Sequence, residues 1–153
     1  MPSVAFWIPV SIEIAVASSR LSDERIRTHA RRRPIVLVNR DVAGIPRVLI
    51  DSGAGVAEAV RHLAQLGHRR IAYVGGPSTS WSHRQRRSAV RRAAAALEVE
   101  VAMVRSLTPT YEAGKAAARP ILATGATAAT AFDDLTAQGA MAGLAERGVS
   151  VPR

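Results

Sequence analysis

The stretch RRIAYVGGPSTSWSHRQRRSAVRRAAAAL, residues 69–97, predicts a strand, a loop and a helix in succession. Its first part is an apolar run that ends in Gly75 and Gly76, and such a run bounded by turn residues is typical of a buried strand. A polar loop follows, and from about Ser82 to Leu97 apolar residues recur at helical spacing. A buried strand that leads into a helix is the repeating unit of α/β folds.

The same alternation continues in both directions from this unit. Strands are expected in residues 11–18, 34–39, 47–51, 99–106 and 125–132, and helices in residues 22–32, 52–66, 111–119 and 134–148. Pro120 stands where the helix that begins at Tyr111 would continue, so we expect that helix to kink or end there. Strands and helices in this order predict an α/β fold, with a parallel sheet and flanking helices.

Arg86 is unusual because it falls on the apolar face of its helix. At 100° per residue it lies within about 60° of the stripe of apolar residues that must face the sheet, which includes Ala89, Val90 and Leu97. Arg84, Arg91 and Arg92 fall on the opposite side of the helix. Burying a guanidinium costs several kcal/mol of free energy unless it has hydrogen-bond acceptors, a carboxylate partner or access to a solvent-filled cleft. In parallel sheets, ligands bind at the carboxyl ends of the strands, which here means residues 75–82 and 132–135.

Arg86 therefore has two interpretations. Its planar fork either binds hydroxyls or a carboxylate of a ligand at that edge, or it forms an internal salt bridge with Asp133 or Asp134. One of these aspartates is expected to cap the helix that follows; we expect Asp134 to be the cap and Asp133 to accept hydrogen bonds from a ligand. Trp81 can stack on a sugar or base, or it can fill a packing position in the loop.

The sequence lacks the motifs of phosphate binding, nucleophilic catalysis and metal binding. GGPSTS has neither G-x-G-x-x-G nor a Walker lysine, and Pro77 removes a backbone donor that a phosphate loop would use. No serine occupies a G-x-S-x-G elbow, and no catalytic partner for His83 can be identified. The chain has no cysteine, and its four histidines lack the spacing of metal ligands. We therefore expect no enzyme activity, no metal and no cofactor.

Neither the net charge nor the N-terminal stretch identifies a function. The formal net charge of +9 favours nucleic-acid binding, but no aromatics interleave with the arginines and no DNA-binding motif is present. Residues 1–19 look like a signal peptide around Ala15–Ala17, yet they lack a basic start and carry Pro9 and Glu13. No stretch is long and apolar enough to predict a membrane span.

Four stretches together resemble the effector-binding core of LacI/GalR-type bacterial transcription regulators: SSRLSDERI, PIVLVNRDVAGIPRVLIDSGAGVAEAVRHLAQLGHRRIAYVGGP, SWSHRQRRSAV and AFDDLTAQGAMAGLAERGVSVP. The most specific part is D-x-x-x-G-x-x-x-A-x-x-H-L-x-x-L-G-H-R-R-I-A, residues 51–72. The resemblance implies an incomplete two-lobe, periplasmic-binding-protein-like architecture. Residues 1–50 would be a partial N-terminal lobe, and residues 51–153 would be most of the C-terminal lobe, without a helix-turn-helix headpiece.

The resemblance also implies a function. In that family a small effector, often a sugar or nucleobase, binds between the lobes and changes the affinity for operator DNA. The matching positions imply that Ser82 and Arg86 contact the effector, and Asp133 stands where the family usually has asparagine. A cytoplasmic homodimer that reaches operator DNA only through a headpiece is implied as well. Two alternatives stay open, an exported solute-binding protein and a truncated reading frame without function.

Overall fold

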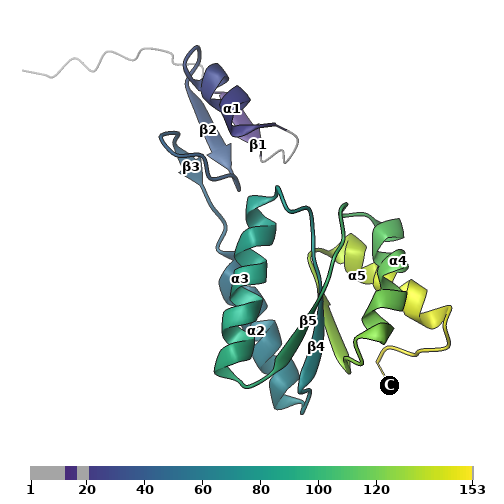
Figure 1. The fold of residues 1–153 in the computed structure, drawn as a ribbon. Helices are drawn as coiled ribbons and strands as arrows, with labels where there is room; N and C mark the ends of the chain where they lie inside the picture. Colours follow the sequence, from purple (N-terminus) through teal and green to yellow (C-terminus); the bar gives the residue numbers. More distant parts are fainter. Residues whose placement is uncertain (1–12, 17–20, 153) are drawn as a thin grey trace, which may run out of the picture. The chain divides into compact units, whose positions relative to one another are not determined.

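The computed structural model describes the backbone of residues 13–16 and 21–152 and the side chains of residues 21–152. The chain divides into two compact units, Met1–Ile50 and Asp51–Arg153, each with its own parallel sheet (Figure 1). The stretch that looks like a signal peptide lies outside the described residues, apart from the backbone of residues 13–16.

The first unit has a three-stranded parallel sheet in the order β1-β2-β3. Its elements are β1 (Glu13–Val16), α1 (Asp23–Ala30), β2 (Ile35–Val38) and β3 (Arg47–Val48). The buried residues of its core are Ile26 from α1, Ile35 and Leu37 from β2, and Val42 and Ile45 from the loop before β3. The third strand is shorter than the sequence predicts, because the residues that follow Val48 are exposed and leave the sheet.

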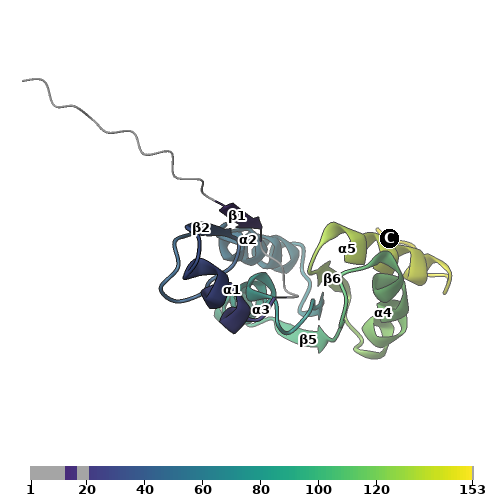
Figure 2. The same cartoon turned by 90° about the horizontal axis from the view of Figure 1, so that it is seen from above.

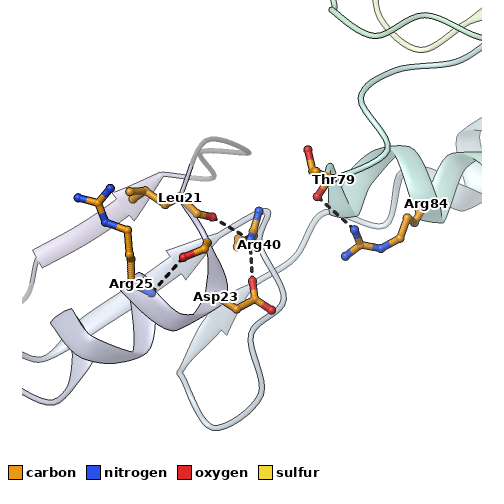
Figure 3. A network of polar contacts seen from close by, with 7 residues as sticks. Leu21, Asp23, Arg25, Arg40, Thr79 and Arg84 are labelled. Atoms are coloured by element: carbon orange, nitrogen blue, oxygen red, sulfur yellow. Dashed lines mark hydrogen bonds and ion pairs between the residues drawn. The ribbon is translucent and has the colours of Figure 1, made fainter.

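Polar contacts fix the start of α1 (Figure 3). The Ser22 hydroxyl accepts a hydrogen bond from the backbone N–H of Arg25 at 3.3 Å, so Ser22 is the N-cap of the helix. Arg40 is buried, and its Nη2 donates to Asp23 Oδ1 at 2.6 Å and to the carbonyl of Leu21 at 3.1 Å. The segment that follows β2 is therefore tied to the beginning of α1 by one buried cation.

The second unit is a three-layer sandwich around a parallel sheet in the order β5-β4-β6. Its elements are α2 (Ser52–Gln65), β4 (Arg70–Val74), α3 (Trp81–Ala96), β5 (Glu100–Val104), α4 (Tyr111–Ala123), β6 (Ala128–Ala131) and α5 (Asp134–Ala145). Helices α2 and α3 cover one face of the sheet, and α4 and α5 cover the other (Figures 1 and 2). The parallel sheet with helices on both faces confirms the predicted α/β class.

Strand β4 forms the centre of this unit because both of its faces are buried. Ile71 and Tyr73 belong to the core under α2 and α3, whereas Ala72 and Val74 belong to the core under α4 and α5. Such a nearly continuous apolar run is typical of a strand that is covered on both sides. The carboxyl end of the central strand is therefore packed between two helical layers.

Helices α4 and α5 pack backbone against backbone. A Cβ atom at Gly139 would lie 1.9 Å from the carbonyl oxygen of Tyr111, and one at Gly114 would lie 2.2 Å from that of Thr136. Gly143 is equally obstructed, with a carbonyl oxygen 2.4 Å from its hypothetical Cβ. Glycine is therefore required at these positions by close approach, and the two helices form one layer.

Of the two outcomes predicted for the helix at Pro120, an early end is wrong, because α4 continues to Ala123. Pro120 and Ala116 are both exposed, so water can bind the carbonyl that loses its intrahelical donor to the proline. Leu66, the last residue of the predicted helix 52–66, is the C-cap and is 63% exposed, whereas Ala64 of the last helical turn is buried.

Candidate functional site

The candidate site lies at the carboxyl edge of the sheet in the second unit. The chain passes from β4 to β5 on one side and then crosses to β6 on the other side of β4. The loops after β4 and β6 therefore leave the sheet at a topological switch point, where α/β folds bind their ligands. Helices α3 and α5 both begin there, capped by Ser80 and Asp133.

Arg86 is half-buried in the second turn of α3 and contacts the loop after β6 and the first residue of α2. Its Nε donates to the Ser52 hydroxyl at 3.2 Å, and its Nη1 donates to the backbone carbonyl of Phe132. Its Cζ atom lies 5.0 Å from the centroid of the Phe132 ring, a cation–π distance. The helical-wheel argument placed Arg86 on the inner face of α3, and these contacts confirm that placement.

The partners of Arg86 are neutral. Across residues 21–152, the ion pairs within 4.0 Å do not include one with Arg86, so the predicted alternative of a salt bridge with Asp133 or Asp134 is wrong. Hydroxyl and carbonyl oxygens satisfy donors without cancelling the charge. Within that described part, Nη2 of Arg86 makes no hydrogen bond. The guanidinium is thus held in place with donor capacity and charge that a ligand can use.

Asp133, and not Asp134, caps α5. Asp133 has an extended backbone, with φ −149° and ψ 176°, and its Oδ1 accepts the backbone N–H of Thr136 at 2.9 Å. Asp134 is the first helical residue and is exposed. The expectation that Asp134 would be the cap is therefore wrong by one residue. Asp133 is half-buried, and the capping bond commits only one of its two oxygens.

Trp81 and Ser82 are the first two residues of α3, and both are half-buried. Arg86 contacts Phe132, the residue directly before Asp133. Within the described residues, no hydrogen bond or ring contact joins Trp81 or Ser82 to Arg86 or Asp133. Their contribution to a ligand site stays a prediction.

His83 is a residue of the site that the sequence did not indicate. It is buried, and its Nδ1 accepts the backbone N–H of Gly76 at 3.0 Å. Its ring stacks on Tyr73, with 6.1 Å between centroids, and meets the ring of Phe132 edge-on at 6.0 Å. The signal that could have found it is its position three residues before Arg86, which places both side chains on one helical face.

The electrostatics of this edge are dominated by arginine. Burial lowers the pKa of His83 below its ordinary value, and the nearby charges of Arg87 and Arg84 lower it further. Burial raises the pKa of Tyr73 to about 12, while Arg86 and Arg87 oppose that rise. Helix α3 carries five arginines and no carboxylate, so its N-terminal end is positive both in side chains and in helix dipole.

Neither a metal site nor a membrane-spanning helix is present in the described part of the chain. No group of three or more histidine, cysteine, aspartate or glutamate side chains is arranged to hold a metal ion. Among the same residues, no helix has the length and hydropathy that crossing a membrane requires.

Comparison with known proteins defines the class to which this fold belongs. Residues 60–153 match the family described as a periplasmic binding protein-like domain. An HTH-type transcriptional regulator from the region upstream of aml in Streptomyces limosus is 36% identical over 134 residues, which cover 82% of this chain and 38% of the relative.

Solved structures show the same relationship. A LacI transcriptional regulator from a Rhodococcus species is similar with a TM-score of 0.83 and 28% identity, covering 95% of this chain and 55% of that one. A LacI-family regulator from Enterococcus faecium, solved with bound ribose, is similar with a TM-score of 0.80 and 25% identity, covering 94% and 55%.

The chain belongs to the periplasmic-binding-protein-like family, and within it to the LacI-type regulators, as its sequence motifs suggested. It spans about two fifths of the length of the curated relative and about half of each solved chain. These relatives are transcriptional regulators, which favours a regulator over an exported solute-binding protein.

Proposed function

We propose that this chain is the effector-sensing part of a LacI-type transcriptional regulator and that it binds a small, sugar-like molecule at the carboxyl edge of its second sheet. The observation that carries the proposal is Arg86. Its guanidinium is held at the switch point of the sheet by a serine hydroxyl and a backbone carbonyl, and no carboxylate of the described residues pairs with it.

Each site residue has a chemical role in this proposal. Arg86 donates from its uncommitted nitrogen to neighbouring hydroxyls or to a carboxylate of the effector. Asp133 accepts from a hydroxyl through the oxygen that does not cap α5. Trp81 stacks on the flat face of a sugar or nucleobase, and Ser82 supplies a further hydroxyl. The ribose bound to the Enterococcus faecium relative supports a sugar over other small molecules.

The wider function follows from the family. We propose that residues 1–50 are a partial N-terminal lobe and residues 51–153 most of the C-terminal lobe of an effector-binding domain. The regulator would act in the cytoplasm as a homodimer, bind operator DNA through a headpiece outside this chain, and neither catalyse a reaction nor hold a cofactor. The relatives support this proposal because both the curated and the solved ones are transcriptional regulators.

Isothermal titration calorimetry tests the proposal directly. D-ribose, D-galactose and adenine are titrated into the full chain and into two variants, Arg86→Ala and the matched control Arg91→Ala, which truncates an exposed arginine of the same helix. A hydrogen bond to a charged group contributes roughly 1.5–3 kcal/mol, so we expect Arg86→Ala to weaken binding by at least about tenfold. Arg91→Ala should bind like the wild type.

The outcomes separate the parts of the proposal. A panel member that binds Arg86→Ala as tightly as the wild type would remove Arg86 from the site. If no member binds the wild-type chain, this chain does not sense a sugar or nucleobase of that kind. Circular dichroism of both variants shows whether the helices are intact, so that a loss of binding is not confused with a loss of fold.

A further inference from the structure

His83 joins the two loops that surround Arg86. On one side its Nδ1 accepts the N–H of Gly76, in the loop after β4, at 3.0 Å. On the other side its ring packs edge-on against Phe132, the residue that follows β6. Phe132 in turn provides both of the contacts that hold the end of the Arg86 side chain, a carbonyl acceptor and a ring under the guanidinium.

Gly75 and Gly76 pack so closely against His83 and Phe132 that neither glycine has room for a side chain. A Cβ atom at Gly76 would lie 2.6 Å from the ring of Phe132, and one at Gly75 would lie 2.9 Å from Cε1 of His83. Phe132 therefore rests directly on the glycine whose N–H is bonded to His83. A displacement of Gly76 would therefore press on the Phe132 ring, which also lies against the guanidinium of Arg86.

The hydrogen bond from Gly76 requires an unprotonated Nδ1. Gly76 is buried, so its N–H has no water as an alternative acceptor, and a protonated imidazole would turn a donor toward it. When Nδ1 of His83 is protonated, the buried amide N–H of Gly76 has no acceptor, and the loop after β4 would have to move for that N–H to find one. The conformation of the loop is thus linked to the charge state of one side chain.

We propose that His83, as a neutral imidazole, is the positioning residue that sets the geometry of Arg86 for effector binding. The part of this inference that concerns the effector rests on the proposed function. The part that concerns Arg86 does not, because the chain of contacts from His83 through Gly76 and Phe132 to Arg86 is present without a ligand.

The groups around His83 favour its neutral form at neutral pH. On α3, Arg84 and Arg87 oppose a further positive charge, and together with burial they lower the pKa of His83. From β4, Tyr73 presents a ring whose hydroxyl is itself kept neutral by burial. From the segment before α5, the contact is with the uncharged ring of Phe132. The geometry of Arg86 should therefore be constant near pH 7 and change only in acid.

Two variants of the full chain separate the acceptor from the ring. His83→Asn keeps an acceptor in the position of Nδ1 and loses the ring, whereas His83→Phe keeps a ring and loses the acceptor. The readouts need no ligand: the ¹⁵N resonance of the Arg86 Nε–H group and the hydrogen-exchange protection of the Gly76 amide. We expect His83→Asn to leave both readouts unchanged. His83→Phe should shift the Arg86 Nε–H resonance and lower the protection of the Gly76 amide by at least about tenfold.

The proposal is overturned if the two variants behave alike, or if His83→Phe keeps both signals. If His83→Phe does not fold, a pH titration of the wild-type chain tests whether His83 sets the geometry of Arg86. There the Arg86 Nε–H resonance must move with the same midpoint as the imidazole of His83, and a resonance that stays constant while His83 titrates contradicts the proposal. A pH series of D-ribose titrations then tests the effector: its affinity should fall with that midpoint, and failure of ribose to bind at any pH would count against the proposed function alone.

Discussion

The glycine contact between α4 and α5 allows a quantitative test of the packing that supports the site. In Gly139→Ala the new methyl group would lie 1.9 Å from the carbonyl oxygen of Tyr111 and 2.8 Å from the amide nitrogen of Lys115. The first distance is about 1.5 Å short of an ordinary van der Waals contact. Both obstacles are backbone atoms, so no side chain can rotate away and the two helices must separate.

The expected cost follows from two opposing effects. Overpacking in a rigid core costs roughly 1–3 kcal/mol, and a backbone obstacle places this site at the upper end. Alanine recovers up to about 1 kcal/mol because its helix propensity is higher than that of glycine. The sum is a loss of about 2 kcal/mol in the free energy of unfolding, a large part of the margin of an ordinary domain.

Gly55→Ala is the matched control, since Gly55 lies inside α2 and a Cβ there meets nothing within 4 Å. It should stabilise the chain by up to about 1 kcal/mol. Urea denaturation followed by circular dichroism measures both variants, and we expect them to differ by about 3 kcal/mol with opposite signs. If Gly139→Ala is as stable as Gly55→Ala, the close packing of α4 on α5 described above is incorrect.

Three further predictions concern buried polar groups. Tyr73→Phe should stabilise the second unit by about 1 kcal/mol in urea denaturation, because the Tyr73 hydroxyl is buried without a hydrogen-bond partner in the described chain; a clear loss would reveal a partner. Arg40→Ala should destabilise the first unit by about 2 kcal/mol, because it breaks the bonds to Asp23 and Leu21, although Asp23 is half-exposed and screened. Unchanged amide exchange in α1 would contradict this. Stability should fall as the pH drops below 6.5, because the unfolded chain takes up a proton at His83 before the folded chain does, and the fall should end once the pH has passed the lowered pKa of the folded chain. His83→Phe should flatten the profile over that range, and a profile with the same slope as the wild type would show that other groups cause it.

Much of the fold could be predicted because its signals are local. The apolar run of residues 71–74 is a strand, as the turn residues after it predict, and both of its faces are buried. The helical period also placed Arg86 on the inner face of α3, since this requires only the spacing of Ala89 and Val90. Local patterns of this kind do not depend on the rest of the chain.

The details of the site depend on contacts between distant segments, and sequence patterns do not contain these. The acceptor of Arg86 is a backbone carbonyl 46 residues further along the chain, and every residue type has one. The choice between Asp133 and Asp134 as cap depends on where the backbone of β6 turns, which two adjacent aspartates do not reveal. His83 looked like an ordinary polar residue because its acceptor role needs Gly76 to be folded over it.

The excess of arginine on α3 has a practical consequence for any measurement of ligand affinity. Several of these guanidinium groups are exposed, and no acidic residue of the same helix balances them. Their attraction for an anionic compound reaches about 30 Å in 0.01 M salt and only about 8 Å at physiological ionic strength. A phosphorylated or acidic sugar will therefore appear to bind more tightly in dilute buffer than a neutral sugar with the same contacts, and only titrations at matched, near-physiological salt will rank the two by fit.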